Sequence, residues 1–137
     1  GGEKVELDEL LKRADCITLH TPLTDETRNI LSGENLAKTK KGVRIVNCAR
    51  GGLIDEAALV EALDSGHVAG AALDVFQEEP LSTDSPFWTM PNVLICSHSA
   101  GTSDRENERI TDIFCENLRR YLAEEPLLNV LDTARMY

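Results

Sequence analysis

The sequence is poor in aromatic residues and in patterns that bind metals or cross membranes. Aromatic residues make up 4% of its 137 residues, and neither the four cysteines nor the three histidines show the spacing of zinc ligands. No apolar run is long enough to span a bilayer, so we expect no signal peptide and no membrane partner. Zinc chemistry and membrane insertion are therefore not among the expected functions.

Positive charge is also scarce. The chain has 14 basic and 24 acidic residues, which gives a formal net charge of −10. No basic cluster is longer than the pair Lys40-Lys41, so we expect neither nucleic acid nor an anionic membrane as a partner. Any site for a small anion must therefore depend on a few local cations.

The cysteines predict free thiols rather than disulfides. Cys16, Cys48, Cys96 and Cys115 are widely spaced, and three of them lie within apolar strand or helix patterns. Buried free thiols in a reducing compartment fit this distribution best. We therefore expect a soluble, cytoplasmic protein.

Short β-branched runs alternate with helical patterns along the chain. The length suits one domain with a substantial core, and the alternation predicts a mostly parallel sheet with right-handed connections. We place this α/β domain at residues 1–125 and a C-terminal tail at residues 126–137. The expected strands span residues 15–20, 43–46, 68–75 and 92–97, and the expected helices span residues 7–13, 32–38, 56–65 and 103–122.

Each of the four expected helices has a candidate capping residue. Asp8, Ser32 and Asp55 fit the N-cap position, and Ser103 with Glu106 fits a capping box. The helix that follows Ser103 carries apolar residues on one face.

Polar side chains lie at or just after the end of each expected strand. In strand order they are Thr21, Arg50, Asp74 with Glu79, and His98. Parallel strands bring these ends to one edge, where open α/β sheets bind ligands. Taken alone, the first three groups have a simpler interpretation: Arg50 as a surface arginine before a glycine turn, Thr21 as a turn residue, and the acids as a solvated loop.

A guanidinium, a carboxylate and an imidazole at one edge would suit acid–base chemistry. Arg50 can hold a carboxylate bidentately. His98 can exchange a proton near neutral pH, and a nearby Glu79 favours the charged ring. This trio suits reduction of a 2-oxo acid, with a hydride supplied by a cofactor.

Three segments resemble motifs of a known enzyme family. Asn47–Glu56 reads NCARGGLIDE, Gly70–Pro80 reads GAALDVFQEEP, and Asn92–Gly101 contains His-x-x-Gly. In this order and at this spacing, and with His20-Thr21-Pro22-Leu23, they resemble the nicotinamide-proximal half of the D-isomer-specific 2-hydroxyacid dehydrogenases. The first part looks most like phosphoglycerate dehydrogenases, and the part from residue 85 looks more like glyoxylate/hydroxypyruvate reductases.

The resemblance implies a Rossmann-like α/β fold, the second half of a dinucleotide-binding domain without its first βαβ unit. It also implies a small 2-oxo or D-2-hydroxy acid as substrate and NAD as cofactor, with NADP as an open alternative. By the same resemblance Arg50 binds the substrate, His98 is the acid/base, and Glu79 orients and charges His98. The implied cofactor-binding residues are Thr21, Cys48, Ala49, Arg50, Asp74, His98 and Gly101.

The sequence also departs from the family pattern. It contains no G-x-G-x-x-G turn for a pyrophosphate and no strand ending in a ribose-binding acid, and Ser97 precedes His98 where proline is commoner. Two functions therefore stay open: an NAD-dependent oxidoreductase or the catalytic half of one, and a non-catalytic truncated α/β module that folds and self-associates without binding NAD. An exposed apolar face on the last helix would favour self-association, so we expect a homo-oligomer.

We predict that the 137-residue chain alone binds NADH weakly or not at all and has little turnover. The reason is that no glycine turn in this sequence places a helix N-terminus at the pyrophosphate. A fluorescence titration with NADH tests this, and a micromolar dissociation constant would contradict it.

Overall fold

The structure, a computed structural model, describes residues 2–134. It divides the chain into one unit that runs to Ala100 and a second that begins at Gly101. The long C-terminal helix therefore groups with the tail, which differs from the predicted boundary at residue 125. The elements, in chain order, are α1 (Leu7–Arg13), β1 (Cys16–Leu19), α2 (Gly33–Ala37), β2 (Val43–Asn47), α3 (Glu56–Asp64), β3 (Val68–Leu73), β4 (Val93–Ile95) and α4 (Glu106–Leu122), with short 3₁₀ helices at Gly51–Leu53 and Pro86–Thr89.

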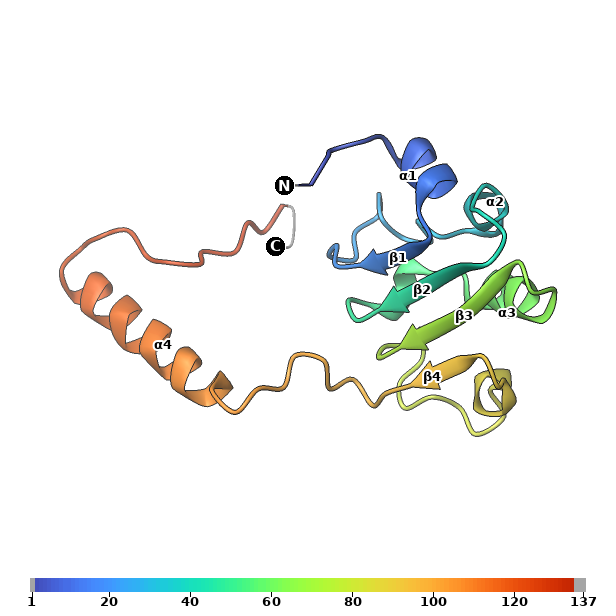
Figure 1. Ribbon diagram of the computed structural model, residues 1–137. Coiled ribbons are helices and arrows are strands. Elements are labelled where there is room, and N and C mark those ends of the chain that lie inside the picture. The colour runs from blue at the N-terminus through green and yellow to red at the C-terminus, as the bar shows by residue number, and fades with distance from the viewer. Residues whose placement is uncertain (1, 135–137) are drawn as a thin grey trace. The chain divides into compact units, whose positions relative to one another are not determined.

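The four strands form one parallel sheet in the order β1-β2-β3-β4. All four arrows in Figure 1 point the same way, so the carboxyl ends of the strands lie along one edge. Each strand pairs with the next along the chain; Ile45 of β2, for example, lies opposite Ile17 of β1 and Ala71 of β3. The predicted parallel, Rossmann-like α/β sheet is confirmed, and the loops after its strands are neighbours.

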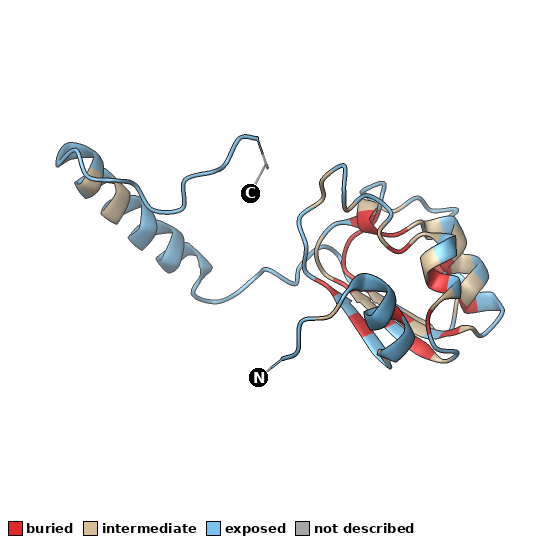
Figure 2. Ribbon diagram, turned by 90° about the horizontal axis from the view of Figure 1, so that it is seen from above, coloured by how far each residue is buried: buried red, intermediate tan, exposed pale blue. Residues whose placement is uncertain are grey.

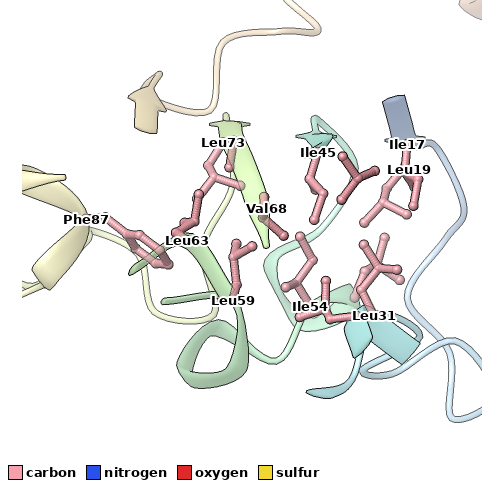
Figure 3. Packing of buried hydrophobic residues seen from close by; sticks show 14 of the residues in the cluster. Ile17, Leu19, Leu31, Ile45, Ile54, Leu59, Leu63, Val68, Leu73 and Phe87 are labelled. Atoms are coloured by element: carbon pink, nitrogen blue, oxygen red, sulfur yellow. The ribbon is translucent and has the colours of Figure 1, made fainter. Parts of the chain in front are cut away.

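One face of the sheet forms the hydrophobic core. Along β2, Val43 and Ile45 are buried while Arg44 between them is exposed, the alternation expected of a strand covered on one side. Figure 3 shows the strand side chains facing a layer that contains Ile54 and Leu59. Full burial of such a side chain stabilises the fold by roughly 1.5–3 kcal/mol relative to an exposed position.

The prediction that the cysteines are buried is wrong. Cys16, Cys96 and Cys115 are exposed, Cys48 is half-buried, and all four are free thiols. Cys16 pairs in register with the exposed Arg44, so it lies on the face of the sheet opposite the core. An apolar strand pattern places a residue on a strand but does not decide which face is covered.

Two of the four predicted helix caps are confirmed. Ser32 Oγ accepts the Asn35 N–H at 3.3 Å, and Asp55 Oδ1 accepts the Ala58 N–H at 3.2 Å. The predicted cap at Asp8 is wrong, because Asp8 lies within α1, which begins at Leu7 without a side-chain cap. The predicted capping box at Ser103 is wrong, because α4 begins only at Glu106 and no side chain caps it.

The second unit contains α4, whose predicted apolar face is exposed (Figure 2). Acidic residues lie in its first turn and basic residues in its last turn, which complements the helix dipole. Across residues 2–134, no helix is both long enough and apolar enough for a bilayer crossing. The exposed apolar residues of α4 are Ile110, Ile113, Phe114, Leu118, Tyr121 and Leu122.

A close backbone contact joins the loops that follow β2 and β3. Gly51 is buried, and a Cβ atom built on it would overlap the main chain of Phe76 and Gln77. Backbone atoms cannot move aside as a flexible side chain would. Only glycine at position 51 therefore allows these two loops to pack together.

We predict that Gly51→Ala lowers the free energy of unfolding by about 1–3 kcal/mol, because the added methyl overpacks the loop contact. Urea denaturation measures the change. Gly33→Ala is the matched control, since its Cβ would lie 3.4 Å from the Ala58 Cβ, an ordinary contact. Equal stability of the two variants would contradict the prediction.

Candidate active site

The loop after β2 carries Arg50 and is held by the side chain of Asn47. Asn47 ends β2 and is buried, with 1% of its surface exposed. Its Nδ2 donates to the Arg50 carbonyl at 2.9 Å, and its Oδ1 accepts the Ala49 N–H at 3.1 Å. The Arg50 guanidinium donates to the Ala49 carbonyl at 2.6 Å, and the residue is exposed at the rim of the sheet.

The loop after β4 carries His98 and is held by Asp74, which follows β3. The Asp74 carboxylate is buried and accepts the N–H groups of Ser99 at 2.8 Å and Ala100 at 2.9 Å. Its carbonyl accepts the His98 N–H at 2.8 Å. The two N–H donors, Ser99 first, lower the pKa of Asp74 and keep it ionised.

The hydrogen bonds between Asp74 and residues 98–100 hold His98 in an uncommon backbone conformation. Its φ is +54°, in the left-handed region that non-glycine residues rarely adopt. Such a conformation persists where the surrounding structure fixes it, and it recurs at functional sites. The hydrogen bonds to Asp74 supply that constraint.

Glu79 bonds directly to the His98 ring. Glu79 Oε2 lies 2.8 Å from His98 Nδ1, and Oε1 accepts the Phe76 N–H at 2.9 Å. The bond to His98 is the main reason that the pKa of Glu79 is lowered, and the Phe76 N–H lowers it further. His98 Nε2 has no hydrogen-bond partner among residues 2–134, so this nitrogen remains available to a ligand.

The loop that carries Glu79 is attached to the start of α3. The Gln77 N–H donates to Glu56 Oε1 at 2.6 Å, and Gln77 Nε2 donates to the Ile54 carbonyl at 2.6 Å. Partial burial raises the pKa of Glu56, and the Gln77 N–H opposes that shift. The loop is thus fixed at Phe76, Gln77 and Glu79.

Two cavities meet at the Glu79–His98 pair. The first, of about 520 Å³, is lined by Arg50, Glu79 and His98 together with Arg28. The second, of about 880 Å³, shares Glu79 and His98 and is also lined by Trp88. The structure therefore brings together the guanidinium, the carboxylate and the imidazole that lie 19 to 48 positions apart in the sequence.

The other predicted site residues lie outside the first cavity. Thr21 is exposed at the end of β1, and Cys48 Sγ lies 3.6 Å from His20 Nδ1. Ala49 contributes its main chain to the hydrogen bonds with Asn47 and Arg50. Their cofactor contacts stay predictions, as does that of Gly101, which begins the second unit.

Sequence reasoning missed two kinds of residue at this site. Arg28 lines the cavity beside Arg50, but it lies in a polar segment without any periodic pattern. Gln77 lies between the predicted site residues Asp74 and Glu79, but an uncharged side chain there gives no signal of a contact with the start of α3. Across the described part of the chain, no three His, Cys, Asp or Glu side chains are placed to hold a metal ion.

Comparison with known proteins identifies relatives of the chain. Residues 1–100 match the sequence model of the family described as "D-isomer specific 2-hydroxyacid dehydrogenase, NAD binding domain". The D-3-phosphoglycerate dehydrogenase of Bacillus subtilis is 45% identical over 129 residues, which cover 94% of this chain and 24% of that protein. The chain thus spans about a quarter of that relative.

Solved structures share the fold. A D-isomer specific 2-hydroxyacid dehydrogenase from Xanthobacter autotrophicus, in complex with NADPH and MES, superposes with a TM-score of 0.89 at 43% identity, over 96% of this chain and 53% of that one. A glyoxylate/hydroxypyruvate reductase from Sinorhizobium meliloti, in complex with NADP and sulfate, gives 0.89 at 38% identity, over 96% and 42%.

We predict that Asp74→Asn lowers stability at neutral pH. The asparagine amide group has only one oxygen, so its NH₂ group would face one of the two N–H groups, of Ser99 or Ala100, and that N–H would lose its acceptor. The pKa of Asp74 is lowered by folding, so ionised Asp74 stabilises the wild type above its unfolded pKa of about 3.9. That contribution is lost as the pH falls through the lower pKa of the folded state.

Urea denaturation between about pH 7 and about pH 3 measures this effect. The wild type should lose more stability on acidification than Asp74→Asn. The exposed Asp64→Asn serves as the control and should follow the wild type. If the free energy of unfolding of the wild type and of Asp74→Asn falls equally on acidification, the stabilising role of ionised Asp74 is refuted.

Proposed function

Because the chain belongs to the D-isomer specific 2-hydroxyacid dehydrogenase family, we propose that it supplies the substrate-binding and proton-transferring residues of an oxidoreductase. The reaction interconverts a small 2-oxo acid and a D-2-hydroxy acid. The observation that carries the proposal is the cavity lined by Arg50 and the Glu79–His98 pair.

In this proposal Arg50 binds the carboxylate of the substrate. Its planar guanidinium presents paired donors that match a carboxylate, and Asn47 holds the loop from which it extends. A bound carboxylate would place the neighbouring 2-oxo group within the same cavity as His98. Orientation by a bidentate contact is the contribution expected of Arg50.

His98 transfers the proton. With Nδ1 bonded to Glu79, a protonated ring carries its second hydrogen on Nε2, the nitrogen without a protein partner in the described chain. During reduction Nε2–H gives its proton to the substrate oxygen as C2 gains a hydride, and the reverse reaction returns it. Glu79 stabilises the imidazolium and fixes the ring orientation.

A nicotinamide cofactor, NAD or NADP, would supply that hydride. The main chain of residues 48–50, Asp74, Thr21 and Gly101 are the proposed contacts for its nicotinamide end. One observation supports this role. Residues 48–50, Asp74 and Thr21 follow strands of a parallel sheet, and their loops lie at its carboxyl edge. No glycine turn for the pyrophosphate occurs in this sequence.

The second candidate is a non-catalytic α/β module. The exposed apolar side chains of α4 favour self-association, and a homo-oligomer remains part of our proposal under either candidate. We also propose a cytoplasmic location. Turnover separates the two candidates, provided that the segments absent from this sequence are supplied.

A chimeric enzyme supplies the segments that this sequence does not contain. Residues of this chain replace the matched 129-residue segment of the Bacillus subtilis enzyme, and NADH absorbance is followed with 3-phosphohydroxypyruvate, hydroxypyruvate and glyoxylate. We expect turnover with at least one acid. His98→Ala should lower kcat by about 10²- to 10⁴-fold, the usual contribution of an acid/base residue, and Arg50→Ala should raise KM and lower kcat/KM.

Arg44→Ala is the matched control, because Arg44 is exposed on β2 and does not line the cavity. It should leave the rate unchanged. Circular dichroism and light scattering establish that each chimera is folded. A folded chimera without turnover on any of the three acids would favour the non-catalytic module.

A further inference from the structure

The cavity beside His98 contains a second arginine. Arg28 comes from the segment between β1 and α2 and lines the same cavity of about 520 Å³ as Arg50. A single carboxylate on the substrate needs only one guanidinium. The second cation therefore requires its own explanation.

The segment that carries Arg28 is fixed to the loop after Arg50. The Asn29 N–H donates to the Gly52 carbonyl at 2.9 Å, and Leu31 N–H donates to the Leu53 carbonyl at 3.1 Å. Asn29, next to Arg28, adopts a positive φ of 51°. These contacts hold Arg28 beside the cavity.

Gly52 lies next to the side chains of Arg28 and Leu23. A Cβ at this position would lie 3.5 Å from Arg28 Nη1 and 2.9 Å from Leu23 Cδ2. The guanidinium is thus packed near the main chain of the residue two positions after Arg50.

Within the described part of the chain, both arginines of the cavity are without an ion-pair partner. No carboxylate forms an ion pair with Arg28 or Arg50 among residues 2–134. Glu79 also lines the cavity, but its oxygens bond to His98 and to the Phe76 N–H. Elsewhere many basic side chains form surface ion pairs, namely Arg13, Lys38, Lys40, Arg105, Arg119 and Arg120.

We infer that Arg28 is a specificity-determining residue that binds a second anionic group of the substrate. The substrate class is then a 2-oxo or 2-hydroxy acid with a carboxylate or phosphate at the end remote from C1. Arg50 takes the C1 carboxylate, and Arg28 takes the remote group. This inference rests on the proposed function, because it assumes that Arg50 holds the C1 carboxylate.

The test is a ¹H–¹⁵N NMR titration of the 137-residue chain with D-lactate, D-malate and D-3-phosphoglycerate at up to millimolar concentrations. The first acid lacks the second anionic group, and the other two carry it as a carboxylate or a phosphate. We expect the two dianionic acids to bind about fivefold more tightly than lactate, the scale of one exposed charge pair. The shifts should centre on Gly51 and Gly52.

Three variants separate the roles of the arginines. Arg28→Gln should abolish the preference for dianionic acids and leave lactate binding unchanged, whereas Arg28→Lys should keep part of that preference. Arg50→Gln should weaken the binding of all three acids. Arg44→Gln, on another exposed arginine, should change none of them.

The outcomes distinguish the inference from the proposed function. If Arg50→Gln weakens all three acids but Arg28→Gln leaves their ratio unchanged, the inference is wrong and the proposed function stands. If no acid shifts the resonances of this cavity, or Arg50→Gln has no effect, both are wrong. An equal response to inorganic phosphate alone would also overturn the inference, since it would show simple ion pairing.

Discussion

The carboxylate of Asp74 is the constraint on which the site depends. A buried carboxylate is costly unless it is hydrogen-bonded, and this one is satisfied by two N–H groups of the segment after His98. The donors that keep Asp74 ionised also fix the backbone of that segment. His98 can therefore hold a positive φ and meet Glu79 at 2.8 Å.

Further contacts hold the loops that follow β2 and β3 next to the loop that carries His98. Gly51 packs against the main chain that leads to Glu79, and Gln77 ties the same segment to α3. Asn47 fixes the loop of Arg50. Three loops from three adjacent strands are thus joined by a close main-chain contact at Gly51 and by side-chain hydrogen bonds of Asp74 and Glu79. The arrangement suits acid–base chemistry because it limits the motion of each functional group.

The sequence carries enough information to predict the sheet and two helix caps, because strand alternation and N-cap chemistry are local signals. It also predicts which strand ends carry Arg50, Glu79 and His98. The exposure of Cys16 could not be predicted, since the covering of a sheet face is decided by distant segments. Arg28 was missed for a similar reason: only the hydrogen bonds of its segment to residues 52 and 53 place it at the cavity.

The most direct measurement is the ¹⁵N chemical shifts of the His98 ring, followed with pH in the wild type and in Asp74→Ala. The account predicts that the neutral ring keeps its hydrogen on Nδ1, toward Glu79, and that the variant loses this preference. A neutral ring with its hydrogen on Nε2, or a tautomer unaffected by Asp74→Ala, would contradict the claim that Asp74 and Glu79 together orient the imidazole.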